Sequence, residues 1–210
     1  MARRLSELVD FKVGRSAGEA LPLIDFLIDE HTRDIRYLVV DAGKWMPQRK
    51  VLIAPDAIEG VREDEKLLQT SLSRDDLENG PRLDADSPLS RSDEEKLVSY
   101  YQWPMYWQAV DGRAVSSQPA ETEQGLENRE QAARVEMEDE SERAPLRSYT
   151  EIKHYRLKKQ GSASGELQDV LVNDHWRVSG LEAQLQGQAQ VLSGDQLAHI
   201  SWDSQVIEVA

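Results

Sequence analysis

The stretch Asp25-Phe26-Leu27-Ile28-Asp29 decides how the fold of this chain is interpreted, because it recurs 144 positions later as Asp169-Val170-Leu171-Val172-Asn173. Further matches follow at an offset of 139, and they pair residues 56–61 with 195–200 and residues 67–68 with 206–207. Short apolar segments that recur in the same order indicate two copies of one structural unit. The sequence therefore predicts an internal repeat.

The first copy consists of short apolar segments separated by polar turns. They are residues 21–28, 35–40, 50–53, 57–61 and 66–72. Their β-branched and aromatic content is typical of half-buried strands, and strands at such short intervals favour a small barrel or sandwich. We expect the second copy to be degenerate, with Leu181-Glu182-Ala183-Gln184-Leu185 in place of Leu38-Val39-Val40.

Between the two blocks of matches the offset shrinks by five residues. We expect all five to be lost from the loop at 43–49, which corresponds to 184–190 in the second copy. We also expect a slightly shifted turn before the second-copy strand, near Gly165.

A helical region follows the first copy. Residues 73–77 predict one capped helical turn, and residues 90–100 predict a helix that begins at Ser90. The helix leads into Tyr100-Tyr101-Gln102-Trp103-Pro104-Met105-Tyr106-Trp107, which holds five of the 13 aromatic residues of the chain.

Residues 108–146 are acidic and poor in large apolar side chains, with 4 Lys and Arg against 10 Asp and Glu. This composition favours a flexible linker, and a solvated helix over 121–142 is the alternative. The predicted fold class is mainly β, with two small barrels in tandem joined by this linker. The predicted domains are 1–107, 108–146 and 147–210.

The formal net charge of the 210-residue chain is −14. Since its basic clusters are small, the charge argues against nucleic acid as a partner. The absence of cysteine excludes disulfides and thiolate chemistry. No apolar run is long enough to span a bilayer, which predicts a cytoplasmic protein without membrane insertion and leaves peripheral membrane association open.

The chain resembles the PRC-barrel domain, which the photosynthetic reaction-centre H subunit and a ribosome maturation factor share. The residues that carry the resemblance are 25–29, 35–45, 50–53 and the tail at 89–107. The match covers 1–107 well and 147–210 loosely. The resemblance implies a six-stranded barrel that binds protein partners and is not itself a catalyst.

The sequence offers little catalytic chemistry. Asp25 and Asp29 flank an apolar strand, where carboxylates have ordinary structural roles. The four histidines show no ligand spacing, and the central residue of Gly161-Ser162-Ala163-Ser164-Gly165 is alanine where a hydrolase elbow needs serine. We therefore predict no catalytic residue, no metal site and no cofactor.

Aromatic side chains are the best candidates for binding a protein partner, because they bury large rigid areas at interfaces. The candidates are Tyr100, Tyr101, Trp103, Tyr106 and Trp107, with a second surface at Trp45 and Lys44. The alternatives are intramolecular: the segment 100–107 caps its own barrel, and the loop of Trp45 folds onto that segment.

The leading hypothesis is a non-catalytic adaptor of the PRC-barrel type, in which a tether raises the effective concentration of two docking barrels. One alternative is an H-subunit-like accessory protein of a membrane electron-transfer complex in the photosynthetic light reactions. Another is a small-ligand or metal-binding protein. The sequence leaves homodimer formation open.

Overall fold

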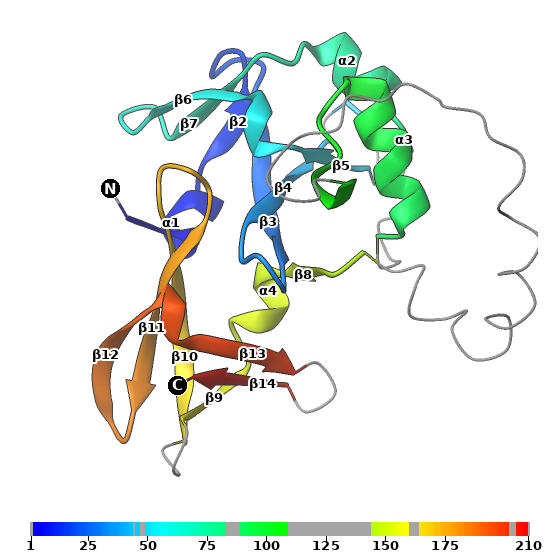
Figure 1. Cartoon of the computed structure of the whole chain (residues 1–210). Coiled ribbons are helices and arrows are strands. Elements are labelled where there is room, and N and C mark those ends of the chain that lie inside the picture. Colours follow the sequence, from blue (N-terminus) through cyan, green and yellow to red (C-terminus); the bar gives the residue numbers. More distant parts are fainter. Residues whose placement is uncertain are drawn as a thin grey trace, which may run out of the picture. The chain divides into compact units, whose positions relative to one another are not determined.

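The computed structural model describes residues 2–43, 45–46, 49–82, 89–108, 144–159, 164–201 and 205–209. The chain forms two units, one made of Met1–Asn79 with Pro145–Ala210 and the other of Gly80–Ala144. Both copies of the repeat lie in the first unit, and each contributes most of one β-sheet (Figure 1).

The first sheet has the strand order β5-β4-β3-β2-β7-β6. Its strands are β2 (Lys12–Gly14), β3 (Leu21–Asp29), β4 (Ile35–Asp41), β5 (Lys50–Ile53), β6 (Ile58–Arg62) and β7 (Leu67–Thr70). The predicted strands of the first copy are thus confirmed. Neighbouring strands are antiparallel except β2 and β7, which run parallel.

The second sheet repeats this topology as β12-β11-β10-β9-β14-β13, with β9 and β14 as the parallel pair. Its strands are β9 (Arg156–Lys159), β10 (Ser164–Val172), β11 (Val178–Leu185), β12 (Gln188–Ser193), β13 (Leu197–Ser201) and β14 (Val206–Val209). A 3-10 turn precedes the penultimate strand in both copies, η1 (Pro55–Ala57) and η3 (Gly194–Gln196). The predicted internal repeat is therefore confirmed.

The residue matches agree with the strand register. Asp25 faces Val39 and Asp169 faces Glu182, each just after a register shift in its strand. The offset is 144 from β2 to β3, so the shifted turn that we expected before Gly165 is wrong. The offset between equivalent residues falls to 143 at β4 and its counterpart β11, and to 139 at β5 and its counterpart β12. One residue is thus lost in the turn after Asp29, and only four in the predicted loop.

The described strands of each sheet form an open path. Within the described residues, the first path ends at β5 and β6 and the second at β12 and β13, and no pairing joins the two ends of either path. The fold is mainly β, as predicted, and the strand pairing among the described residues does not confirm the two small barrels in tandem that the sequence predicts.

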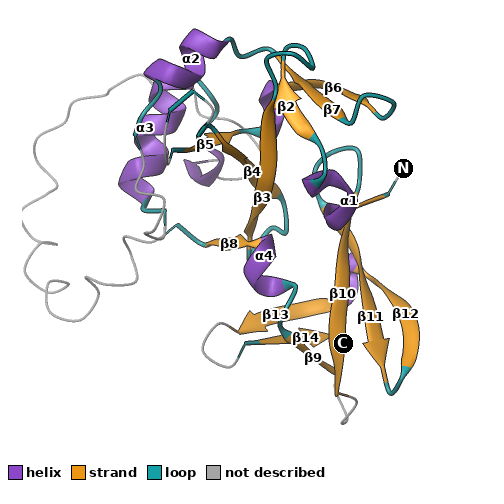
Figure 2. Cartoon of the chain, turned by 180° about the vertical axis from the view of Figure 1, so that it is seen from behind, coloured by secondary structure: helices purple, strands orange, loops and turns teal. Residues whose placement is uncertain are grey.

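The two copies exchange their first strands. β1 (Arg3–Arg4) pairs with β10 of the second sheet, and β8 (Leu146–Ser148) pairs with β3 of the first. Each exchanged strand leads directly into a short helix: β1 into α1 (Leu5–Val9) and β8 into α4 (Tyr149–Ile152), as Figures 1 and 2 show. The copies are therefore interlocked within one unit and are not the separately docking bodies of our adaptor hypothesis.

Two equivalent aspartates hold the exchanged segments. Asp25 accepts hydrogen bonds from the Ser148 hydroxyl (2.5 Å) and from the Thr150 amide and hydroxyl (both 3.0 Å). Asp169 accepts hydrogen bonds from the amide and hydroxyl of Ser6 and from the Tyr149 hydroxyl (2.8 Å). Thr150 lies 144 positions after Ser6, so the two equivalent carboxylates bind equivalent helix starts, each from the other copy.

The turns after β3 and β10 also pair reciprocally. The Ile35 amide donates to the Trp176 carbonyl (2.7 Å), and the Val178 amide donates to the Arg33 carbonyl (2.9 Å). Between these bonds, Asp34 and Arg177 form an isolated antiparallel bridge. Because each bond is matched by its equivalent from the other copy, the copies are related by an approximate two-fold axis at this bridge.

The core of the first unit lies on the inner faces of these strands and under the two exchanged helices. Its fully buried side chains include Leu5, Phe26, Leu38, Leu68 and Leu157. Phe26 and Tyr149 pack edge to face with ring centroids 6.4 Å apart, so a side chain of the second copy completes the core of the first. Burial of apolar area is the main stabilising contribution in such a core.

The helices after the first sheet follow the prediction. α2 (Arg74–Asn79) begins after Ser73, whose hydroxyl accepts a hydrogen bond from the Asp76 amide (3.2 Å). α3 (Arg91–Tyr101) belongs to the second unit and is followed there by η2 (Tyr106–Gln108). The predicted acidic linker lies almost wholly outside the described residues, so the domain boundaries at 107/108 and 146/147 stay predictions.

Candidate aromatic interaction surface

Local signals at both ends of α3 position the aromatic side chains. The Ser90 hydroxyl accepts a hydrogen bond from the Asp93 amide (3.1 Å) and so satisfies a free donor at the helix start. At the other end Gln102 adopts a left-handed conformation with φ 57°, and the Trp103 amide donates to the Val98 carbonyl (3.0 Å). This 6→1 bond is that of a Schellman motif, and it turns the chain back at Trp103.

The reversal builds an aromatic row from Tyr100, Tyr101 and Trp103. The rings of Tyr101 and Trp103 stack with centroids 4.4 Å apart and an interplanar angle of 17°. Tyr100 meets Tyr101 edge-on at 4.7 Å. Tyr100 is 42% exposed, and the other two are half-buried. The structure therefore brings three of the predicted residues together as a stacked, partly exposed surface.

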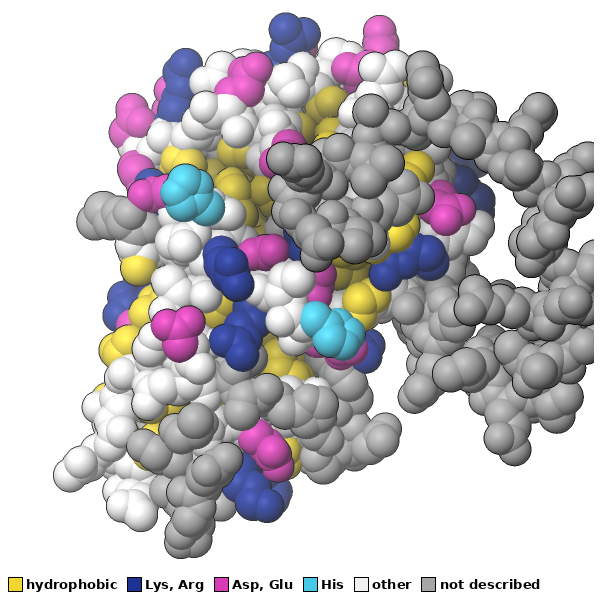
Figure 3. Space-filling model, viewed as in Figure 1, with side chains coloured by type: hydrophobic (Ala, Val, Ile, Leu, Met, Phe, Trp, Pro, Cys, Tyr) yellow, Lys and Arg dark blue, Asp and Glu magenta, His cyan; other side chains and the backbone are white. Residues whose placement is uncertain are grey.

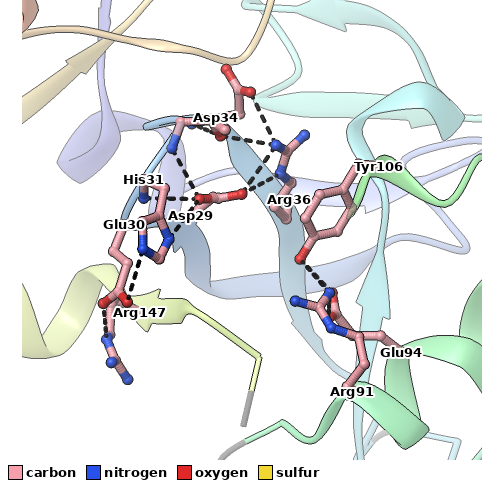
Figure 4. Close-up of polar contacts among 10 residues, drawn as sticks. Asp29, Glu30, His31, Asp34, Arg36, Arg91, Glu94, Tyr106 and Arg147 are labelled. Carbon is pink, nitrogen blue, oxygen red and sulfur yellow. Dashed lines mark hydrogen bonds and ion pairs between the residues drawn. The ribbon is translucent and has the colours of Figure 1, made fainter. Parts of the chain in front are cut away.

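Tyr106 and Trp107 are held by α3 in a different way. Glu94 is fully buried on the helix and accepts hydrogen bonds from the Tyr106 hydroxyl (2.8 Å) and the Arg91 guanidinium (2.6 Å), as Figure 4 shows. The same guanidinium lies 4.4 Å from the Trp107 ring centroid. Burial and the nearby carboxylate raise the pKa of Tyr106, so this phenol stays a hydrogen-bond donor. This cluster fastens η2 to its own helix.

The second predicted surface belongs to the other unit. Trp45 is half-buried, and the guanidinium of Arg74 from α2 lies 5.0 Å from its ring centroid. Lys44 lies outside the described residues. The roles of both residues in binding stay predictions, as do those of the aromatic candidates.

The carboxylates considered for acid–base chemistry are held in structural networks. Asp29 accepts hydrogen bonds from the amides of His31 (2.9 Å) and Thr32 (3.0 Å) and pairs with Arg36 (3.0 Å; Figure 4). Although burial acts to raise the pKa of Asp29, the two amides and Arg36 outweigh it and hold this pKa below its ordinary value. An ionised carboxylate fixed in this way does not supply a proton near neutral pH.

A cavity of about 300 Å³, which the sequence did not reveal, lies between β6 and the turn after β10. It is lined by Arg3, Leu8, Ile58, Val61, Val172 and Trp176, among others. The equivalent place in the other copy, around Ile28, Ile152 and Ile200, holds a cavity of only about 10 Å³. Arg3, which lines the larger cavity, is paired with Asp174 (2.7 Å) and Glu63 (3.1 Å), so the charge of this arginine is compensated within the chain.

In comparisons with known proteins, no family model matches the chain and no curated protein matches it. In the described parts of the chain, no three His, Asp or Glu side chains are grouped so as to hold a metal ion. No helix in those parts is long and apolar enough to cross a membrane.

Proposed function

We propose that this protein is a non-catalytic protein–protein interaction module of the PRC-barrel type, which docks a partner through the aromatic row Tyr100, Tyr101 and Trp103. The observation that carries the proposal is the geometry of this row. Its stacked rings are already ordered, so little side-chain entropy is lost on binding, and Tyr and Trp are the residue types enriched at interface hot spots.

The surroundings of the row support a polar rim. Lys96 and Ser99 lie on the same helix and are exposed, and Lys96 pairs with Asp93 (2.8 Å). Apolar rings surrounded by solvated polar groups are the usual anatomy of an interface. On the face seen in Figure 3, acidic and basic side chains are interspersed, which fits a protein partner better than a polyanion.

The interlocked repeats and the aromatic row belong to different units of the chain. In place of two tethered barrels, we propose one two-copy body and one separate unit that carries the aromatic row. Each offers the partner a different surface, and a partner that contacts both would gain from their covalent connection.

The test is capture with the full-length tagged protein, quantified against two variants. Trp103→Ala removes the stacked indole, and Ser92→Ala, at an exposed position in the first turn of the same helix, is the matched control. A partner that docks at the aromatic row should bind Ser92→Ala as well as it binds the wild type. Loss of a hot spot of about 2 kcal/mol should weaken binding to Trp103→Ala by about 30-fold. Equal capture by both variants would refute the docking surface.

A further inference from the structure

The outer edge of β12 differs from a protected edge strand. Its sequence, Gln188-Ala189-Gln190-Val191-Leu192-Ser193, has neither a charged residue nor proline. Edge strands usually carry such residues, or a covering element, to prevent pairing with another chain. β6, which ends the first sheet, carries Glu59 and Arg62.

The equivalent strand of the first copy shows what β12 lacks. Val191 faces Glu182 of β11, as Leu52 of β5 faces Val39 of β4. Leu52 is 7% exposed, whereas Val191 is 66% exposed and is, with Tyr100, one of two large exposed apolar side chains in the described residues. The chain therefore covers this position in one copy and leaves it open in the other.

The hairpin between β11 and β12 determines which backbone groups point outward. Gln186 and Gly187 both have positive φ (51° and 80°), so Leu185 and Gln188 close a two-residue turn and form a hydrogen-bonded pair. Because pairs alternate, Ala189, Val191 and Ser193 direct their amides and carbonyls away from β11. The Ser193 amide already donates to Gln196 Oε1 (3.0 Å). Within the described part of the chain, the outward groups of Ala189 and Val191 have no partner.

We propose that two copies of this chain pair antiparallel through β12, with Gln190 of each copy facing Gln190 of the other on the two-fold axis. In this register Ala189 of one copy faces Val191 of its partner, and two such pairs form four backbone hydrogen bonds. These bonds use the groups that are free and leave the Ser193–Gln196 bond intact. Exposed Val191 gains an apolar neighbour on the same face of the joined sheet.

Charge favours self-association at this strand more than elsewhere on a chain of net charge −14. β12 adds no charge, and Glu182 on the adjacent strand is paired with Arg4 of β1 (2.7 Å). The remaining surfaces of two acidic copies still repel each other, and salt screens this repulsion. The dimer should accordingly become tighter, not weaker, as ionic strength rises.

The register is tested by cross-linking, because the natural chain has no cysteine. Facing residues of a non-hydrogen-bonded antiparallel pair have Cα atoms about 4.5 Å apart, which a disulfide can bridge. Gln190→Cys should therefore give a covalent dimer under mild oxidation. Gln188→Cys is the matched control, since its two copies would lie about 14 Å apart along the strands. Covalent dimers from Gln188→Cys but not from Gln190→Cys would overturn the register.

Sedimentation velocity of the full-length protein tests the dimer itself. We expect reversible dimers that tighten with salt, and we expect Val191→Lys to raise the dissociation constant about tenfold or more by placing charge in the joined edge. The exposed position of Val191 makes it tolerant of substitution. A protein that stays monomeric at every concentration and salt, or a dimer indifferent to Val191→Lys, would overturn the proposal.

Discussion

Removal of one carboxylate should test the interlocking of the two copies most directly. Asp169 is 4% exposed and receives the Tyr149 hydroxyl from α4 and the amide and hydroxyl of Ser6 from α1. Asp169→Ala leaves the buried Tyr149 hydroxyl without its acceptor, at a cost of about 1.5–3 kcal/mol for a bond to a charged group. Ser6 is exposed, so water replaces part of the hydrogen bonding that Ser6 loses. The missing cap at the start of α1 adds about 1 kcal/mol.

The free energy of unfolding should therefore fall by about 3 kcal/mol in Asp169→Ala. With a urea m-value of about 2 kcal/mol/M, the unfolding midpoint moves down by roughly 1.5 M. Gln168→Ala, on the exposed side of the same strand, is the control and should change stability by less than about 0.5 kcal/mol. In a double-mutant cycle, Asp169→Ala and Tyr149→Phe should couple by at least about 1 kcal/mol. A loss below about 0.5 kcal/mol for Asp169→Ala, or additive effects in the cycle, would refute the proposed role of this carboxylate.

Three further outcomes follow from the same geometry. Asp29→Asn keeps an acceptor for the turn amides but loses the ion pair, so it should cost about 1–3 kcal/mol near pH 7. The folded-state pKa of Asp29 is depressed, so this stabilisation is full above the ordinary pKa of about 4 and is lost as the pH falls from there through the folded-state pKa. Urea titrations of the wild type and Asp29→Asn at pH 7 and pH 3 measure the penalty. A penalty that is the same at both pH values would show that the reasoning is wrong. A methyl group on Gly165 would collide with the Gln184 carbonyl, so Gly165→Ala should lower the thermal midpoint while Gly18→Ala, in open space, leaves it nearly unchanged. Cleavage at a protease site inserted within 108–143 should leave the two halves co-eluting under native conditions, because strands are exchanged between them; separation without denaturant would contradict the exchange.

The repeat could be predicted from the sequence because strands that bury one face must keep their apolar residues in register. Asp25 and Asp169 lie at equivalent places in such strands, and each faces the equivalent position of the neighbouring strand, Val39 in one copy and Glu182 in the other. The exchange could not be predicted in the same way. β1 and β8 have two and three residues, too few to show a period, and strand partners are not written in local sequence. The signal that the sequence did offer was a short match at the same offset of 144, which pairs Arg3 with Arg147, Ser6 with Thr150 and Glu7 with Glu151.

The candidate site was predictable in composition but not in arrangement. Five aromatics within eight residues are visible in any sequence, and the helix before them has clear capping residues. Glu94, however, reads as a solvated helix residue, and its burial follows only from the Tyr106 hydroxyl and the Arg91 guanidinium that meet it. Sequence reasoning therefore grouped Tyr106 and Trp107 with the exposed row, whereas the structure ties both to Arg91.

The symmetry between the copies separates structural residues from candidates for function. At the junction it is kept in chemical detail: Arg147 pairs with Glu30 (3.0 Å) as its equivalent Arg3 pairs with Asp174 (2.7 Å). Such matched pairs are explained by the need of each copy to hold the other.

Other features differ between the copies. Leu52 is covered while Val191 is exposed, and the junction cavity of about 300 Å³ corresponds to one of only about 10 Å³ at the equivalent place. The exposed valine and the larger cavity each occur in one copy only. The fold that the two copies share therefore does not require either of them. Features present in one copy only are therefore where binding should be sought, and the edge of β12 is the one whose free hydrogen-bonding groups already define the geometry of a partner.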